Sequence, residues 1–548
     1  MQGIENHIKV FVKSFLFIVI FSFGGNSYGE EKPVLTKKIF KTGKALYEKQ
    51  CAVCHGITGA ADGKAAYLLY PKPRDFTRDK FRLVSTTNME ATDQDLFQTI
   101  SRGMPGSAMP PWEYLKTEDR WALVYYVRYL SEFEKYKAAG EITQDMIDKE
   151  VPWPLIKKIV SKIIDEKILI KVLEEPEVTP ESLAEGKALF LASCAGCHGT
   201  EGKGDGQKEM KDNLGYPLKP RDLTAGIYKG SSSSQDLYCR MIGGMPGGPM
   251  PSYSGALTEK QIWDLIHYVQ TFSTPEIEER SHLRQQNLIA QKINGEISLD
   301  PLSQQWNGIK SNDVVLTPLW WRNERIEGIE VKAAYNEKKV AFYLTWPDSS
   351  PESDAVAVQS FVDGAAIQLS PQKDPPFFGM GEKNNPVYIW HWKASWSEDL
   401  GDRKDIESRY PNAAVDWYKA QRNYEYGASF EVRESKVKLH DPEFITGWGA
   451  GNPLSDPAKE NAAEAATSSG FSSYTTQSAA AKAVQSQGVW KDGKWHVVFM
   501  RTLNSSDKKD LQFKKGSVLS AAFAIWDGSH RDRNGQKAVS IWNKLILK

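Results

Sequence analysis

Residues 51–55 read Cys-Ala-Val-Cys-His, and residues 194–198 read Cys-Ala-Gly-Cys-His. These two segments contain four of the five cysteines in a chain of 548 residues. The pattern is typical of covalent haem c attachment, because two thiols on one turn add to the haem vinyl groups and the adjacent imidazole then reaches the iron. Disulfides and zinc are the alternative uses of such cysteines, but neither accounts for two copies within a longer repeat. We therefore predict two covalent haems c, held by the following residues: Cys51, Cys54 and His55, and Cys194, Cys197 and His198.

An internal repeat surrounds the two motifs. Each copy contains a Gly-Lys-Ala-Leu segment, a Lys-Pro-Arg-Asp segment and a Gly-Met-Pro-Gly segment that is followed by Met-Pro. Each copy closes on an aromatic amphipathic segment, whose spacing predicts a helix that packs across the first one. In the first copy these segments begin at Gly43, Lys72, Gly103 and Trp121, and in the second at Gly186, Lys219, Gly244 and Trp263. The duplication predicts two tandem all-α cytochrome c domains, over residues 30–140 and 180–275.

Each copy also offers a second axial ligand for its iron. A methionine thioether on the far side of the haem plane makes a six-coordinate iron with a raised potential, which suits electron transfer. Small soluble c-type cytochromes carry this ligand in a Met-Pro step after a glycine-containing turn, and resemblance to them favours Met109 and Met250. Met104 and Met245 are the alternatives. All four methionines could instead only pack the pocket.

A further segment precedes the helical domains. A short apolar run, Phe15–Phe23, lies between lysines and small residues at cleavage spacing, which predicts a secretory signal peptide over residues 1–29. A retained membrane anchor is the alternative, but the run is shorter than the roughly 20 residues that a spanning helix needs. We expect export to the periplasm or an equivalent compartment, with no membrane span in the mature chain.

Residues 141–179, between the two helical domains, form a predicted helical linker, with an amphipathic helix over 155–173.

The composition excludes two classes of protein. The 69 Lys and Arg residues balance 69 Asp and Glu residues, so no overall basic field is present for binding nucleic acid. The chain contains 17 Trp, 22 Tyr and 22 Phe residues, and such a content of large apolar side chains excludes a disordered chain.

After residue 276 the hydrophobic pattern changes from helical spacing to alternation. Residues 329–346 and 489–499 each alternate on both sides of a turn, which predicts two hairpins. Ser517–Trp526 adds a further apolar strand. Residues 276–548 are therefore expected to form an antiparallel β-sandwich. Within them, the stretch 458–487 is rich in Ala, Ser and Thr and is expected to be a long surface loop.

Several short blocks in about the last 250 residues carry a resemblance. They are Thr345–Asp348, Phe361–Ala365, Gly379–Gly381, Trp390–Trp392, Gly493–Val497, Phe523–Gly528 and Arg533–Lys537. Their order resembles that of the haem b (gamma) subunit of the ethylbenzene dehydrogenase and type II dimethyl sulfoxide reductase family. Subunits of this kind belong to periplasmic molybdenum enzymes and pass electrons between the iron–sulfur subunit and outside carriers.

The resemblance implies one haem b in the β-sandwich, with Met380 and Lys537 as the iron ligands. Met380 lies between two glycines, which would let backbone and thioether approach a flat macrocycle. A lysine ligates iron only as a neutral amine, which requires burial that lowers its pKa. His391, His496 and His530 are the alternative ligands. His391 stands between two tryptophans and is expected to be a core residue.

These features predict an exported electron-transfer subunit with two haems c and one haem b. We expect it to dock to an iron–sulfur subunit and a molybdopterin catalytic subunit, and to exchange electrons with a soluble or membrane-associated cytochrome. The fused c domains resemble the gamma subunits of nitrite oxidoreductase-type complexes. No catalytic residue is expected, because six-coordinate iron leaves no site for substrate. A dihaem peroxidase-like enzyme and a carbohydrate-binding sandwich fused to cytochromes are the rival interpretations.

Overall fold

The computed structural model describes most of the chain, and the described residues from Leu35 to Lys548 form one packed unit. The predicted signal peptide lies outside the described residues. The described residues are 31–161, 166–212, 215–400, 406–412, 459, 461–477, 484–505, 507 and 510–548.

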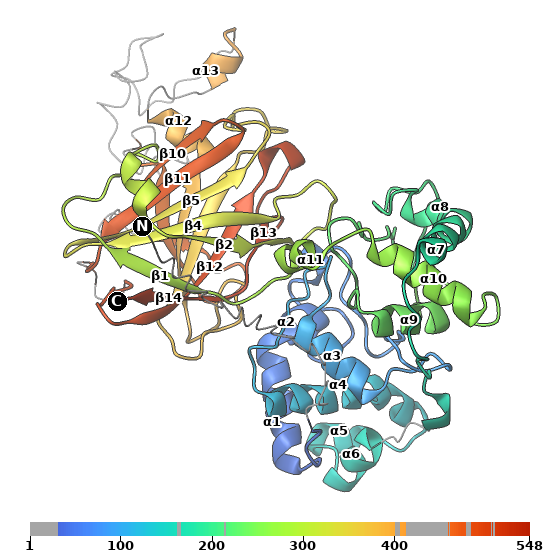
Figure 1. Cartoon of the computed structure of the whole chain (residues 1–548). Helices are drawn as coiled ribbons and strands as arrows, with labels where there is room; N and C mark the ends of the chain where they lie inside the picture. Colours follow the sequence, from blue (N-terminus) through green and yellow to red (C-terminus); the bar gives the residue numbers. More distant parts are fainter. Residues whose placement is uncertain are drawn as a thin grey trace, which may run out of the picture. The chain divides into compact units, whose positions relative to one another are not determined.

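The first helical domain is built on a close crossing of its first and last helices (Figure 1). A Cβ on Gly43 would lie 2.0 Å from the Ala122 carbonyl oxygen, so only glycine permits this approach of the two backbones. Thr92 and Asp95 form a capping box at the start of a third helix, which satisfies backbone N–H groups there. The helices are α1 (Lys37–Gln50), α2 (Ala52–His55), α3 (Asp93–Arg102) and α4 (Thr117–Ala138).

The second helical domain repeats this crossing. A Cβ on Gly186 would lie 2.0 Å from the Asp264 carbonyl oxygen, so the glycine of each Gly-Lys-Ala-Leu segment has the same packing role. Its helices are α7 (Pro180–Ser193), α8 (Ala195–His198), α9 (Ser234–Gly243) and α10 (Glu259–Gln270), followed by α11 (Pro275–Ser281). The predicted pair of helical domains is confirmed.

The predicted linker helix over 155–173 is wrong in its length. The structure has α5 (Gln144–Lys149) and α6 (Trp153–Val160), and the latter ends at Val160. Leu169 forms an isolated antiparallel bridge with Thr86, and the Ile170 N–H donates to the Ser85 carbonyl at 2.8 Å. The apolar side chains of α6 pack into the core of the first domain, whereas Ile170 packs into the core of the second. Among the described helices, none combines the length and apolarity needed to cross a bilayer.

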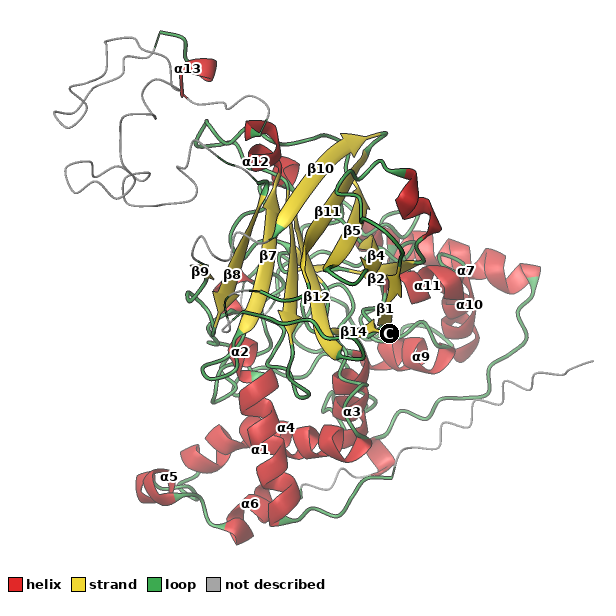
Figure 2. Ribbon diagram, turned by 90° about the vertical axis from the view of Figure 1, so that its left-hand side faces the viewer, coloured by secondary structure: helices red, strands yellow, loops and turns green. Residues whose placement is uncertain are grey.

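The C-terminal half is a β-sandwich, whose strands gather into one body in Figure 2. One sheet has the order β10-β11-β5-β4, with β2 beside β4, and the other has the order β14-β12-β6-β7-β8-β9. Short helices α12 (Ala394–Asp399) and α13 (Ile406–Arg409) follow β7. The strands are β1 (Asn287–Lys292), β2 (Ser311–Val315), β3 (Thr317–Pro318), β4 (Gly328–Tyr335), β5 (Lys339–Pro347), β6 (Gly364–Ser370), β7 (Val387–Lys393), β8 (Ala463–Ser468), β9 (Thr475–Thr476), β10 (Gln485–Lys491), β11 (Lys494–Thr502), β12 (Val518–Trp526), β13 (Ala538–Val539) and β14 (Asn543–Leu547).

Alternating side chains of the two sheets form one apolar core. Trp346 on β5 and Trp392 on β7 meet edge to face, with ring centroids 6.2 Å apart. Both predicted hairpins are confirmed as β4–β5 and β10–β11. Asp492 and Gly493 in the second turn have φ values of 52° and 74°, as a two-residue type I′ hairpin requires.

The predicted sandwich is confirmed, with two differences. Strand β1 runs parallel to both β14 and β4, and it thereby joins the two sheets. The predicted loop over 458–487 contains β8, which pairs with β7 in antiparallel register. Small side chains suit this strand because it packs beside Trp390 and Trp392 of β7, so local propensity misled the prediction.

Candidate haem sites

The first Cys-x-x-Cys-His segment lies where α1 ends and α2 begins. Cys51 caps α1 through its backbone N–H, which donates to the Tyr47 carbonyl at 2.8 Å. The N–H groups of Cys54 and His55 both donate to the Cys51 carbonyl, at 3.1 and 2.9 Å. Two thiols and one imidazole are therefore held within a single turn. Burial raises the pKa of the Cys51 and Cys54 thiols to about 12 each.

His55 is oriented as a metal ligand. Its Nδ1–H donates to the Arg74 carbonyl at 3.0 Å, which leaves Nε2 with a free lone pair. The Phe76 ring stacks on the imidazole with a centroid separation of 4.6 Å. Burial lowers the pKa of His55, so the imidazole is held neutral, as iron ligation requires.

His198 occupies the same position in the second domain. Its backbone N–H donates to the Cys194 carbonyl at 2.9 Å, as in the first copy. Burial, and secondly the charge of Lys229, lowers the pKa of His198 to about 4. Its Nδ1 is buried without a hydrogen-bond partner among the described residues.

A cavity in the second domain brings the predicted haem residues together. Its walls come from α7, α8 and α9 and from the loops between them. Cys194, Cys197 and His198 line it, and so do Met245 and Met250. Both thiols, the neutral imidazole and two thioethers thus face one space, so the residues present fit a haem c.

The two methionines of each copy lie at the base of a closed loop. The Met245 N–H donates to the Met250 carbonyl at 3.1 Å, and the Met104 N–H donates to the Met109 carbonyl at the same distance. Met104 and Met109 line a smaller cavity, which Thr317 of the sandwich also lines. The structure therefore keeps both methionines of each copy close together. It does not distinguish between them, so the choice of Met109 and Met250 as iron ligands stays a prediction.

The predicted haem b ligands lie on the outer face of the β6–β7–β8–β12 sheet. Met380 and Trp526 both pack against the apolar cluster on this face. The Lys537 Nζ lies 4.6 Å from the centroid of the Trp526 ring. The floor between the larger side chains consists of the alanines Ala366, Ala466, Ala522 and Ala524. Such small side chains leave a flat apolar surface that a planar macrocycle could cover.

The backbone and the charge state at these two positions are unusual. Met380 has a φ of 73°, which is rare for a residue other than glycine. Its carbonyl accepts a hydrogen bond from the Gly470 N–H at 2.8 Å, and this contact holds the turn in place. Burial lowers the pKa of Lys537 to about 8, toward the neutral amine that iron ligation requires.

The prediction that His391 is a core residue is wrong. On β7 the side chains of Trp390 and Trp392 enter the core, so the intervening His391 faces the opposite way, toward the alanine floor. Its ring stacks on Trp526 with centroids 4.7 Å apart. Burial, followed by the charges of Lys393 and Lys537, holds the pKa of His391 well below its usual value.

The other two histidines have different partners. His496 Nδ1 on β11 is 2.6 Å from the Tyr343 hydroxyl on the neighbouring strand β5, in the sheet that does not carry His391. His530 Nδ1 is 2.7 Å from the Asp527 carboxylate. Of the three alternative haem b ligands, His391 is therefore the one that the structure places beside Lys537.

The backbone at Lys537, directly before β13, is hydrogen bonded to a segment that contacts the first c domain. The Leu319 N–H donates to the Lys537 carbonyl at 2.9 Å, and the Tyr70 N–H donates to the Leu319 carbonyl at 3.0 Å. The rings of Tyr70 and Trp320 stack, with centroids 5.2 Å apart. The candidate haem b site and the first c domain thus share a continuous set of contacts.

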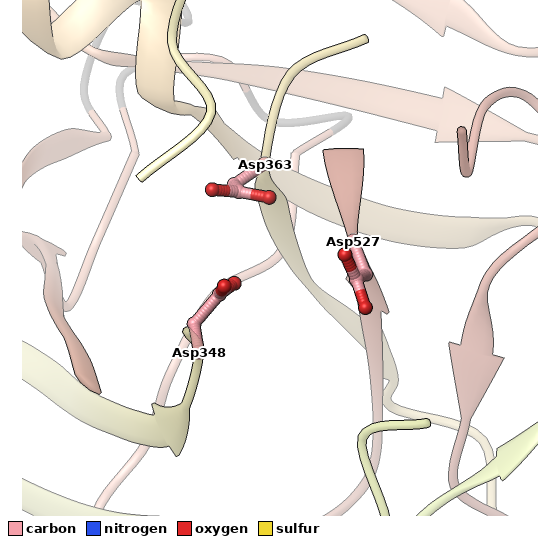
Figure 3. A group of neighbouring side chains, drawn as sticks. All are labelled: Asp348, Asp363 and Asp527. Atoms are coloured by element: carbon pink, nitrogen blue, oxygen red, sulfur yellow. The ribbon is translucent and has the colours of Figure 1, made fainter. Parts of the chain in front are cut away.

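Sequence reasoning missed a group of three buried carboxylates, which converge at one end of the sandwich in Figure 3. Oxygens of Asp348, Asp363 and Asp527 all lie within 4.8 Å of one another. Burial is the main cause that raises the pKa of Asp348 to about 6 and that of Asp363 to about 7. Oxygen ligands at this spacing could hold a hard cation such as calcium. The available signal was that each aspartate belongs to one of the short blocks named above.

Three parts of the chain match known families. Residues 306–538 match the family described as ethylbenzene dehydrogenase. Residues 183–273 match cytochrome c, and residues 39–127 match the family described as cytochrome C oxidase, cbb3-type, subunit III.

Individual proteins show similarity over less than half of the chain. A putative respiratory nitrate reductase heme subunit of Haloferax mediterranei is 24% identical over 44% of this chain and 66% of its own length. The dimethylsulfide dehydrogenase subunit gamma of Rhodovulum sulfidophilum is 24% identical over 41% of this chain and 62% of its own length. The matches thus span just under two thirds of each of these relatives. A chain of the reducing HAO-like protein complex of Kuenenia stuttgartiensis is 32% identical, with 44% of this chain and 100% of that chain covered and a TM-score of 0.35.

Proposed function

Residues 306–538 are an ethylbenzene dehydrogenase domain that follows two cytochrome c domains, and from this premise we propose that the protein is a periplasmic electron-transfer subunit with two haems c and one haem b. It relays electrons between the iron–sulfur subunit of a molybdenum oxidoreductase and an external cytochrome or respiratory chain. The partner enzyme is a nitrite oxidoreductase or a related nitrate, chlorate or hydrocarbon enzyme. The names of the two curated relatives, a nitrate reductase heme subunit and a dehydrogenase subunit gamma, support this assignment.

One observation carries the proposal. The cavity of the second domain gathers both thiols, the histidine and two methionines around a single space. Haem iron bound there supplies one-electron redox chemistry. His198 and one of the two methionines would hold the iron there, which would leave no position for a substrate and would suit the site to electron transfer.

The protein residues keep each site in one protonation state. His55 stays neutral because it is buried and donates its Nδ1–H to the Arg74 carbonyl. His198 stays neutral mainly because it is buried, which lowers its pKa to about 4. An electron can therefore enter or leave without an accompanying proton transfer at the ligand, which keeps reorganisation small.

The haem b site rests on the alanine floor beside Trp526. In this proposal Met380, in the loop before β7, and Lys537, in the segment after β12, would hold the haem b iron. The lowered pKa of Lys537 favours the amine that ligation needs. His391 is the second candidate for this role, because it stacks on the same tryptophan.

Purification of the native complex from its source tests the proposal. We expect the chain to co-purify with an iron–sulfur subunit and a molybdopterin subunit, and pyridine haemochrome spectra to show two haems c for each haem b. A homogeneous monomer that turns over a small oxyanion without companion chains would contradict the proposal. The absence of extractable haem b, together with binding of a sugar, would favour the carbohydrate-binding interpretation.

A further inference from the structure

The cavity of the second cytochrome c domain carries an excess of positive charge. Among the described residues that line it, none is an Asp or a Glu. Grouping cations in an apolar space is unfavourable unless an anion compensates them. The positive side chains that line it are Arg82, Arg221 and Arg240. Lys229 also lines it, but burial, followed by the charges of the nearby arginines, holds the pKa of Lys229 well below its usual value.

One of these cations comes from the other domain. Arg82 belongs to the first repeat, where it follows the Lys-Pro-Arg-Asp segment. Its Nη2 lies 3.5 Å from the Asp212 carboxylate. Its Nη1 is buried and has no hydrogen-bond partner among the described residues. One face of this guanidinium is therefore available to an anion.

The methionine loop of the second domain leaves room for this side chain. A Cβ on Gly248 would lie 2.7 Å from the Arg82 Nη1, so the guanidinium packs directly against the loop between Met245 and Met250. The backbone before α3 is also fixed, because Arg240 of α9 donates to the Val84 carbonyl at 2.7 Å.

An arginine of the second domain contacts the first domain in the same way. Arg221 of the second domain places its Nε 3.4 Å from the Pro105 carbonyl in the methionine loop of the first domain. A Cβ on Gly106 would lie 2.0 Å from this Nε. Each methionine loop is thus contacted by an arginine of the other domain.

We propose that Arg82 of the first domain is a carboxylate-binding residue of the second domain's haem site, where its free Nη1 pairs with a haem propionate. This inference rests on the proposed haem c in the second domain. Haem carries two propionates, and these anions are the counter-charge that the buried arginines of this lining require. Arginine suits this role because its planar guanidinium binds a carboxylate through charge-assisted hydrogen bonds.

The pairing has a consequence for the redox potential. A nearby fixed cation stabilises the ferrous state relative to the ferric state, because the ferric haem carries one more positive charge. A buried charge is screened little by salt. Arg82 therefore raises the potential of the second haem, although it belongs to the first domain.

The test is a redox titration of the full chain with both haems attached. The titration should show one redox transition for each haem c. The variants Cys54→Ala and Cys197→Ala each lack one haem, so they assign each transition, or wave, to its domain. We expect Arg82→Gln to lower the potential of the second-domain haem by about 59 mV, which is a tenfold change in the ferric-to-ferrous ratio for one electron. Arg82→Lys keeps the charge but not the guanidinium fork, and it should give a smaller shift.

Arg78→Gln is the matched control, because Arg78 is an exposed arginine of the same segment. It should leave both waves in place. The inference is overturned if the second-domain wave is unmoved in both Arg82 variants, or if only the first-domain wave moves. Failure of the proposed function is distinct, since the unaltered protein would then carry no covalent haem in the second domain. If Arg82→Gln does not accumulate with both haems, Arg82→Lys decides the question by the same measurement.

Discussion

Cys197 and Cys239 lie in the same helical domain, but they have different surroundings. Cys197 lines the cavity with His198, whereas Cys239 is buried in the apolar core. Replacement of Cys197 with Ala should remove one of two covalent haems, because one thioether bond is lost and the site is weakened. Haem staining of the denatured chain measures this. Cys239→Ala is the control and should keep both haems, and retention of both haems in Cys197→Ala would contradict the attachment site.

A pair of substitutions can decide whether Lys537 or His391 is the haem b ligand. Arginine cannot lose its proton in a protein, so Lys537→Arg should lose haem b or leave it five-coordinate, while both haems c remain. His391→Gln should keep the haem b spectrum. The optical spectrum and the potential of haem b are the measurements. The reverse pattern, with haem b lost only in His391→Gln, would assign the ligand to His391.

At the scale of single elements, the crossing of α7 and α10 depends on Gly186. A methyl group there would lie 2.0 Å from the Asp264 carbonyl oxygen, so the helices must separate. We expect Gly186→Ala to destabilise the protein by about 1–3 kcal/mol, as overpacking does, and thermal unfolding measures the loss. Gly196→Ala is the control, since a Cβ at Gly196 meets open space. Equal stability of the two variants would show that the crossing tolerates a wider spacing.

The carboxylate group at the strand ends predicts a pH dependence. An unfolded Asp titrates near 3.9, whereas the folded pKa of Asp348 is about 6 and that of Asp363 about 7. The folded state binds these two protons more tightly than the unfolded chain does. The contribution of proton binding to the free energy of unfolding is therefore complete below about pH 4, and it is lost as the pH rises through about 6 to 7. Asp348→Asn should therefore raise the stability at pH 8 by on the order of 1–2 kcal/mol and have little effect at pH 4.

Chemical denaturation at several pH values checks this expectation. Asp300→Asn is a suitable control, because Asp300 is exposed on the same sandwich domain. A stability curve for Asp348→Asn that runs parallel to the unaltered one at every pH would contradict the electrostatic origin.

For the whole molecule, the first c domain and the sandwich meet at Trp320. This ring stacks on Tyr70 and lies 5.6 Å from the Lys72 Nζ. We expect Trp320→Ala to weaken the junction by about 1–2 kcal/mol, the sum of a stacking and a cation–π contact, and to leave haem content unchanged. Calorimetry should then show earlier unfolding than in Leu302→Ala, which removes another exposed apolar side chain. Identical transitions for the two variants would contradict a stabilising role of this contact.

The sequence by itself determined the features that depend on neighbours along the chain. The Cys-x-x-Cys-His turns and the Asp-Gly hairpin follow from residue spacing and backbone preference. The alternation after residue 276 also indicated the sandwich, because a strand exposes successive side chains to opposite faces. Met380 and Lys537 came from a resemblance between short blocks.

Tertiary structure decided what depends on residues far apart in the chain. It turned His391 toward Trp526 instead of the core, and it made a strand of the Ala-rich stretch beside β7. It also brought Arg82 into the cavity of the other domain and gathered the three aspartates of Figure 3. The physical reason is that burial and charge proximity depend on distance in space, which local propensity and spacing along the chain do not specify.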